Sequence, residues 1–302
     1  MGAKISQAAL GAIRSPAGTY IRALSALPGY TRFISMTDVE RSSISTREIL
    51  KGRLLDAKPV NEKRYGHIYT MVRTIADMFG IAMPELWVSR RAYEDAPGMR
   101  NCFAFIHKKI TAVQFTKELL ADDVSIDEMR AAVGHEIGHI VYHAAELDTW
   151  IKAFVQKLFN EDEQYLTEEE RRLIKNADDP VWHCIFLANI ISQMDEMNAD
   201  RIAVLASQDP AIPADWVIAN DPHSSVKRRD GLTPEMDDLD MSHPHPLIRK
   251  KCMELFFDSD VCRSAGLGVG RYTIDEVNAA VLEMLPIRLF RDSFEVTGLM
   301  GG

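Results

Sequence analysis

The 302-residue sequence has few cysteines, no long hydrophobic run and no excess of positive charge. Its four cysteines form no CxxC pair, which argues against a disulfide framework and predicts a reducing, cytoplasmic location. The longest apolar stretch, residues 181–191, is far short of the ~20 residues that span a bilayer, so we expect no transmembrane helix. Residues 1–30 lack a convincing signal cleavage site, and secretion is not expected. The net charge of −9 argues against a nucleic-acid partner, because phosphates need clustered cations.

The charge is unevenly distributed along the chain. Residues 1–53 carry eight Lys or Arg against three acidic residues, a net charge of +5, and are rich in Ser, Gly and Ala. We interpret them as a basic N-terminal extension that could make peripheral contact with an anionic membrane surface. Residues 54–302 have the composition of a packed domain, which we expect to hold the function.

Hydrophobic spacing predicts an α+β fold that is mainly helical with a small sheet. Apolar residues at helical spacing predict one helix before the sheet, a capping box formed by Ser125 and Glu128 predicts a long helix after it, and a further helix is expected beyond the acidic segment 160–179. The expected helices are 67–79, about 126–147 and about 183–206, and the expected strands are 86–89, 102–106 and 110–115, the last two forming a hairpin. Four prolines predict that residues 209–235 form a loop.

The strongest functional signal is His135-Glu136-Ile137-Gly138-His139, an HExxH motif on the second expected helix. Residues at i and i+4 lie on one helix face, so both imidazoles can reach one zinc ion. Glu136 lies about 100° round the helix, close enough to act on water without binding the metal. Gly134 and Gly138 each cost roughly 1 kcal/mol of helix stability relative to alanine, which suggests close packing.

A catalytic zinc needs a third protein ligand. The HExxHxxGxxH pattern fails, because its last position is Ala145, and three ligands from one straight helix, with His143 as the third, would splay too far. Glu196 and Asp200 are i and i+4 on the next expected helix, so their carboxylates point the same way. We expect Glu196 to bind zinc and Asp200 to accept the outer N–H of a zinc-binding histidine. The competing interpretation is a solvated acidic stripe.

Four segments in order resemble one protein family. They are Asn101-Cys102-Phe103-Ala104, residues 128–139 ending in HExxH, Glu196-Met197-Asn198-Ala199-Asp200, and Ser242-His243-Pro244 with Arg249 six residues after the histidine. Together they resemble the gluzincin metallopeptidases typified by HtpX and the type 1 CAAX prenyl protease. Cys102 replaces that family's usual alanine. The chain lacks the family's membrane helices and is similar to its soluble or peripheral members, so prenylated substrates are not implied.

The resemblance implies a zinc metalloendopeptidase with one zinc per chain and a protein or peptide substrate. Glu136 would be the general base, and His243 a donor to the oxyanion, with His245 as the other candidate and Arg249 close by. The strand containing Asn101, Phe103 and Ala104 would bind an extended substrate at a sheet edge.

The alternative is a zinc-binding module that is latent or does not hydrolyse peptides and acts through a protein partner. In that case the acidic segment 160–179, or the C-terminal region, would cover the cleft.

Overall fold

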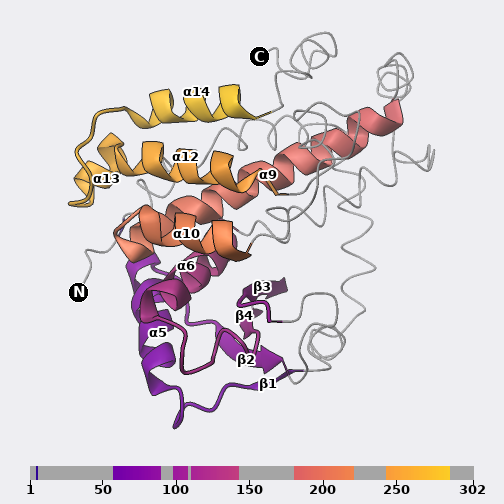
Figure 1. Ribbon diagram of the computed structural model, residues 1–302, viewed down its shortest axis with the longest axis vertical. Coiled ribbons are helices and arrows are strands. Elements are labelled where there is room, and N and C mark those ends of the chain that lie inside the picture. The colour runs from indigo at the N-terminus through magenta and orange to yellow at the C-terminus, as the bar shows by residue number, and fades with distance from the viewer. Residues whose placement is uncertain are drawn as a thin grey trace.

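A computed structural model describes Ile5 and residues 57–89, 98–107, 110–142, 180–220 and 243–285. Within these ranges the protein is mostly helical with one small mixed sheet, which confirms the α+β prediction (Figure 1). Most of the basic extension and the whole acidic segment 160–179 lie outside the described residues. Ile5 is the exception: its N–H donates to the carbonyl of Met78, 2.9 Å away, and it packs against the core.

The sheet has four strands in the order β1-β2-β4-β3. They are β1 (Ala57–Pro59), β2 (Glu85–Ser89), β3 (Cys102–His107) and β4 (Ile110–Phe115). β3 and β4 pair antiparallel up to His107 opposite Ile110, which confirms the hairpin, whereas β2 and β4 are parallel. β3 therefore lies at one edge of the sheet. β1 was not expected, because three residues are too few to show an alternating pattern.

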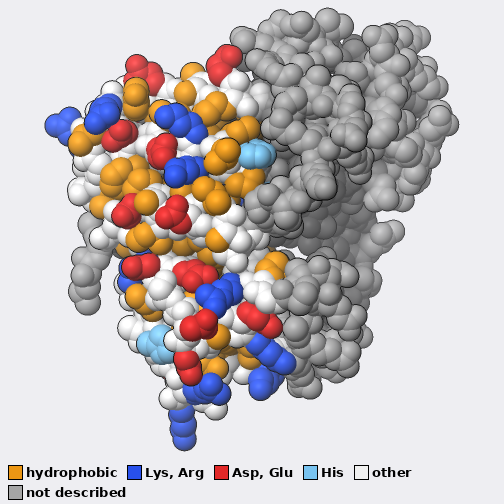
Figure 2. Space-filling view, viewed as in Figure 1, with side chains coloured by type: hydrophobic (Ala, Val, Ile, Leu, Met, Phe, Trp, Pro, Cys, Tyr) orange, Lys and Arg blue, Asp and Glu red, His pale blue; other side chains and the backbone are white. Residues whose placement is uncertain are grey.

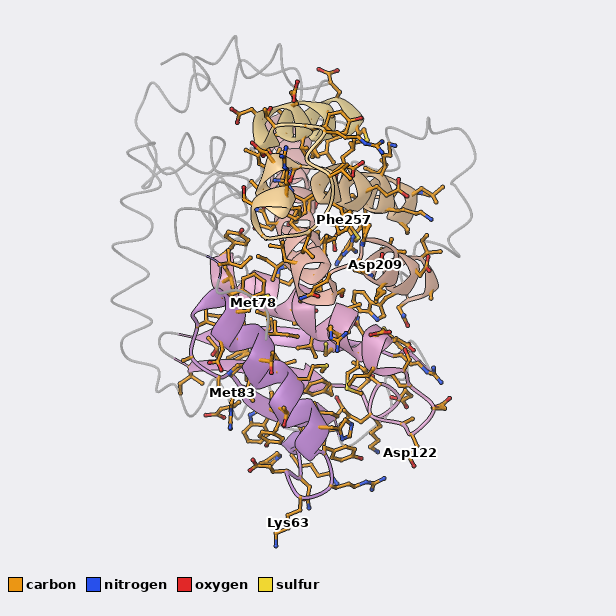
Figure 3. The ribbon with its side chains drawn as sticks, turned by 90° about the vertical axis from the view of Figure 1, so that its left-hand side faces the viewer. Lys63, Met78, Met83, Asp122, Asp209 and Phe257 are labelled. Carbon is orange, nitrogen blue, oxygen red and sulfur yellow. The ribbon has the colours of Figure 1, made fainter. Side chains whose placement is uncertain are left out.

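Two helices, α5 (Gly66–Phe79) and α6 (Ile126–Tyr142), lie close to the sheet (Figure 1). α5 ends at Gly80, whose φ of 68° is the left-handed conformation that glycine adopts readily. Figure 3 shows α5 in front of the sheet, with Met78 near one end of the helix and Lys63 at the tip of the loop before it. α6 begins where Ser125 Oγ accepts the N–H of Glu128, as predicted. Its expected last turn, 143–147, lies outside the described residues.

The other helices lie on the far side of α6 from the sheet (Figure 1). They are α9 (Pro180–Ser207), α10 (Ala211–Asn220), α12 (Pro246–Phe257), α13 (Asp260–Ser264) and α14 (Ile274–Met284). α9 confirms the third predicted helix. Among the described residues, no helix combines the length and the apolar character that crossing a membrane requires.

The prediction of a loop over 209–235 was wrong for residues 211–220, which form α10. Asp209 Oδ1 accepts the N–H of Ala211, 2.8 Å away, and so caps the helix. Pro213 is the third residue of α10, where a backbone N–H has no partner within the helix, so its missing donor costs nothing there. Residues 221–235 lie outside the described residues.

The described surface carries charges of both signs. On the face shown in Figure 2, Lys and Arg side chains are interspersed with Asp and Glu and with apolar groups. No basic stripe is visible on the described part of that face, such as a nucleic-acid backbone would require.

Candidate metal centre

Two glycines allow α6 to cross α9 at very short distance. A Cβ on Gly138 would lie 2.5 Å from the Cα of Ala199, and one on Gly134 would lie 3.0 Å from the Cα of Ala203. No real side chain tolerates 2.5 Å to a backbone atom, so the close packing predicted from the glycines is confirmed. The contact with Ala199 places the HExxH motif against the segment that contains Glu196 and Asp200.

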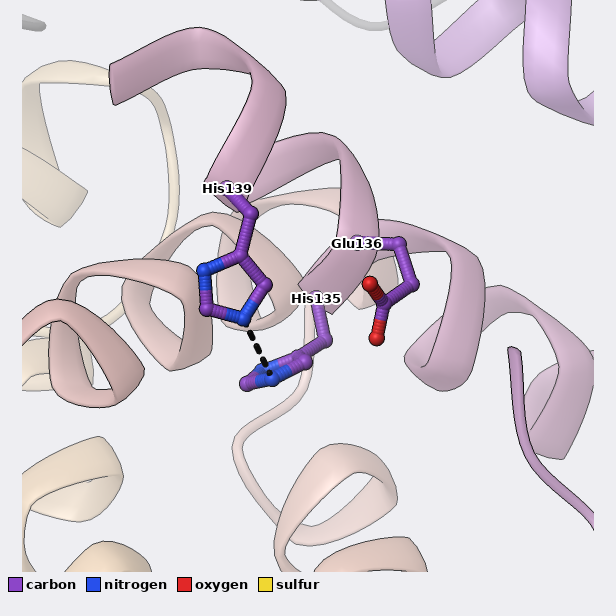
Figure 4. A group of neighbouring side chains, drawn as sticks. All are labelled: His135, Glu136 and His139. Atoms are coloured by element: carbon purple, nitrogen blue, oxygen red, sulfur yellow. Dashed lines mark hydrogen bonds between the residues drawn. The ribbon is translucent and has the colours of Figure 1, made fainter. Parts of the chain in front are cut away.

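Both histidines of the motif project to the same side of α6 (Figure 4). Their Nε2 atoms are 3.2 Å apart, and the rings meet edge to face with centroids 4.7 Å apart. The ligand-capable atoms of His135, Glu136 and His139 all lie within 4.8 Å of one another. The spacing argument from the sequence therefore holds in three dimensions: two imidazole nitrogens converge, and a carboxylate lies beside them.

Glu196 faces both of these nitrogens from α9. Its Oε2 is 3.1 Å from His135 Nε2, and its Oε1 is 3.4 Å from His139 Nε2. Oε2 is buried yet accepts no hydrogen bond of good geometry, a costly state for a carboxylate oxygen. Glu136 is also near, but its Oε2 already accepts the backbone N–H of Ala104. A cation bound by His135, His139 and Glu196 would satisfy the three converging atoms, so the residues present fit a metal ion.

Asp200 and Arg249 support His135 from behind. Asp200 Oδ1 is 2.9 Å from His135 Nδ1, which favours a proton on Nδ1 and leaves Nε2 as a lone-pair donor toward the cation site. Arg249, from α12, donates to both oxygens of Asp200, with Nε 2.8 Å from Oδ2 and Nη2 2.6 Å from Oδ1. All three side chains are buried. The structure thus places Asp200 and Arg249 behind the histidine.

The ionisable side chains of the site are buried together and shift one another's pKa values. Burial alone would raise the pKa of the Glu196 carboxyl, but the surrounding imidazoles hold it well below its usual value. Burial would likewise lower the pKa of His135, yet the carboxylates of Glu196 and Asp200 raise it to about 10. For Asp200 burial is again opposed, here by Arg249, and the pKa falls. Glu136 differs, because burial raises the pKa of its carboxyl above the usual value.

Replacing Arg249 by methionine is expected to lower the free energy of unfolding by about 3–5 kcal/mol, because the Asp200 carboxylate would stay buried without its bidentate partner. The matched control is Arg271→Met. Arg271 is largely exposed and 3.7 Å from Asp258, so its loss should cost less than about 1 kcal/mol. Urea denaturation of both variants measures the difference. Equal losses in the two variants would contradict the structural role of Arg249.

The two candidate histidines, His243 and His245, have different contacts in the structure. His245 is the N-cap of α12, and its Nδ1 accepts the N–H of Leu247 at 3.2 Å. His243 is half-exposed, with its Nε2 3.4 Å from Glu196 Oε1. His243 is therefore close to the Glu196 carboxylate, whereas the side chain of His245 caps the start of α12.

The strand expected to bind substrate borders the same site. The backbone N–H of Ala104, on edge strand β3, donates to Glu136. Asn101 precedes the strand, and its side-chain oxygen accepts the N–H of Cys102 at 2.8 Å. Phe103 is partly buried and pairs with Gln114 of β4. The structure thus places Ala104 at the site, while the Asn101 oxygen is used within the chain.

Sequence reasoning missed Trp216 on α10. Its indole ring lies 5.7 Å from the ring of His135, centroid to centroid. The residue fell in the segment expected to be a loop, and no motif marks it. A tryptophan in the mostly apolar segment 211–218, which Asp215 interrupts, was the only available signal, and it indicates burial rather than a site.

Comparison with known proteins identifies the family of this chain. A sequence model of peptidase family M48 matches residues 62–254, nearly two thirds of the chain. The chain belongs to peptidase family M48. Its members are metallopeptidases, and the match covers the HExxH helix, Glu196, Asp200 and Arg249.

Curated relatives resemble part of the chain. The Protease HtpX homolog of Thermoplasma volcanium is 33% identical over 87 residues, which are 29% of this chain and 26% of that protein. The Protease HtpX homolog of Picrophilus torridus is 32% identical over 96 residues, 32% of this chain and 28% of the relative. Protease HtpX homolog 1 of Saccharolobus solfataricus is 30% identical over 87 residues, which are 29% of this chain and 26% of that protein. These alignments span about a quarter of each relative's length.

Proposed function

We propose that this M48 protein is a zinc-dependent metalloendopeptidase. The observation that carries the proposal is the convergence of His135 Nε2, His139 Nε2 and the Glu196 carboxylate, at 3.1 to 3.4 Å from one another. Two imidazoles and one carboxylate form a ligand set that zinc takes in hydrolytic enzymes. Family membership and the names of the HtpX homologues support the same chemistry.

In this proposal different residues of the chain bind the metal, transfer the proton and stabilise the oxyanion. Zinc held by His135, His139 and Glu196 would supply a Lewis acid that could polarise the scissile carbonyl and lower the pKa of water to about 7. Glu136 accepts a proton from the attacking water at a carboxylate oxygen and delivers it to the leaving amine. Its buried position and raised pKa suit both transfers. His243, at the open side of Glu196, donates to the oxyanion that develops on the substrate.

Edge strand β3 provides the place for a substrate. An extended peptide can add to an exposed sheet edge through main-chain hydrogen bonds. β3 lies at that edge, and its Ala104 N–H is already bonded to Glu136, so a peptide on this strand would pass next to the general base. We therefore propose protein or peptide substrates held in extended form, with Phe103, Ala104 and the preceding Asn101 in the binding strand.

Removal of the metal is expected to abolish hydrolysis. The substrate is a proteome-derived peptide library, with new termini detected by mass spectrometry, because main-chain binding does not require a particular sequence. 1,10-phenanthroline should stop cleavage and added zinc should restore it, whereas the non-chelating 1,7-isomer should have no effect. Cleavage that persists after metal removal, or no cleavage by zinc-loaded protein, would contradict the proposal.

A further inference from the structure

Trp216 connects the metal-site helix with the strand proposed to bind substrate. The residue is on α10 and its side chain is buried. Its ring lies 5.7 Å from that of His135, with the planes tilted by 49°. Its indole N–H donates to the backbone carbonyl of Arg100, 3.4 Å away. One side chain therefore contacts a proposed metal ligand with its ring and the chain before β3 with its polar atom.

The Arg100 end of this connection is fixed by other contacts as well. Arg100 lies two residues before β3 begins at Cys102. Its guanidinium pairs with Asp123 and lies 3.7 Å from Glu128 in the first turn of α6. The indole N–H of Trp216, on α10, donates to the backbone carbonyl of Arg100. The entry into edge strand β3 is thus attached to both neighbouring helices.

At His135, the contact with the Trp216 ring limits how the imidazole can tilt. Asp200 Oδ1 and Arg249 Nη2 hold the ring at Nδ1, at 2.9 and 3.4 Å, but both contacts meet the imidazole at one atom, about which the ring can still tilt. A large aromatic ring packed beside the imidazole restricts the tilt and so directs Nε2 toward Glu196 and His139.

The geometry points to Trp216 as a positioning residue that serves the metal site and the substrate strand at once. The ring orients His135 for metal binding, and the indole N–H sets the position of the chain that enters β3. The inference rests on the proposed function, since it assigns the two ends of Trp216 to the metal and to the substrate of that reaction.

Two variants separate the two roles. Trp216→Phe keeps an aromatic ring beside His135 and removes the N–H donor, whereas Trp216→Met removes both and still fills much of the space. Trp87→Phe is the matched control, because its indole N–H is bonded to the Glu85 side chain on β2, at 3.1 Å. Zinc affinity is measured by competition with a chromophoric chelator, and kcat and KM are measured on a peptide that the wild type cleaves.

We expect Trp216→Phe to bind zinc as the wild type does and to raise KM several-fold with little change in kcat. Trp216→Met should raise the zinc dissociation constant about 10-fold, the size found for groups that orient metal ligands. Trp87→Phe should change neither quantity. If Trp216 had only a structural role, both Trp216 variants would have a lower thermal midpoint. Trp216→Phe would then not show a raised KM at unchanged zinc affinity.

Wild-type zinc affinity in a folded Trp216→Met protein would overturn the role of the ring, and an unchanged KM in Trp216→Phe would overturn the role of the N–H. If Trp216→Met does not fold, as judged by circular dichroism, the Trp216→Phe arm decides on its own, since it must raise KM at constant zinc affinity. A wild type that binds zinc and cleaves no peptide would refute the proposed function, while the zinc titrations would still decide the role of the ring.

Discussion

Replacing Glu136 by glutamine is expected to lower peptide turnover by at least 10²- to 10⁴-fold while leaving the metal bound, because this is the range that a positioned general base contributes. Glutamine has the same size, and its carbonyl oxygen can still accept the N–H of Ala104, so the local structure should persist. It cannot take up a proton at neutral pH. Glu136 also lies beside the ligand set rather than between the two Nε2 atoms (Figure 4).

Turnover and zinc content are measured on the same preparation of this variant. The control is Glu283→Gln, the same substitution at an exposed position on α14, which should behave as the wild type does. A Glu136→Gln protein that holds zinc and retains wild-type turnover would show that another group takes the proton.

The second large effect is expected at the helix crossing. Gly138→Ala should lower the free energy of unfolding by about 1–3 kcal/mol and weaken metal binding. Alanine favours a helix over glycine by about 1 kcal/mol, but the new methyl group would lie 2.5 Å from the Cα of Ala199 and must push the two backbones apart. Because Ala199 lies between Glu196 and Asp200 in α9, the displacement carries both carboxylates away from the histidines.

A matched control separates the clash from the change of residue type. Gly66, the first residue of α5, has no atom within 4 Å of a Cβ built on it, so Gly66→Ala should be neutral or slightly stabilising. Urea denaturation and zinc competition report both effects. Unchanged stability and zinc affinity in Gly138→Ala would mean that the two helices do not need this close approach.

The sequence predicts much of the site because the functional residues are spaced one helical turn apart. The i, i+4 spacing places His135 with His139 and Glu196 with Asp200, whatever the details of packing. The glycines then indicate which face of α6 meets α9. The spacing does not predict at which residues α6 and α9 cross. The structure shows that they cross where Gly138 contacts Ala199.

The parts that sequence reasoning missed are those in which a local rule meets an exception. Pro213 predicts a loop, yet it is tolerated in the first turn of α10, where it needs no hydrogen bond. That error hid Trp216, since a tryptophan in a loop has no defined neighbour. His243 and His245 both precede a proline and look alike in the sequence. In the sequence only the spacing to Arg249 favours His243, and the structure adds the capping bond of His245 and the distance from His243 to Glu196.

The central claim is that His135, His139 and Glu196 together hold one zinc ion, and zinc content per chain tests it most directly. Elemental mass spectrometry on wild type, Glu196→Ala and the surface control Glu283→Ala should give about one zinc per chain in the first and third proteins and clearly less in the second. No zinc in the wild type after zinc is added back, or full occupancy in Glu196→Ala, would contradict the account.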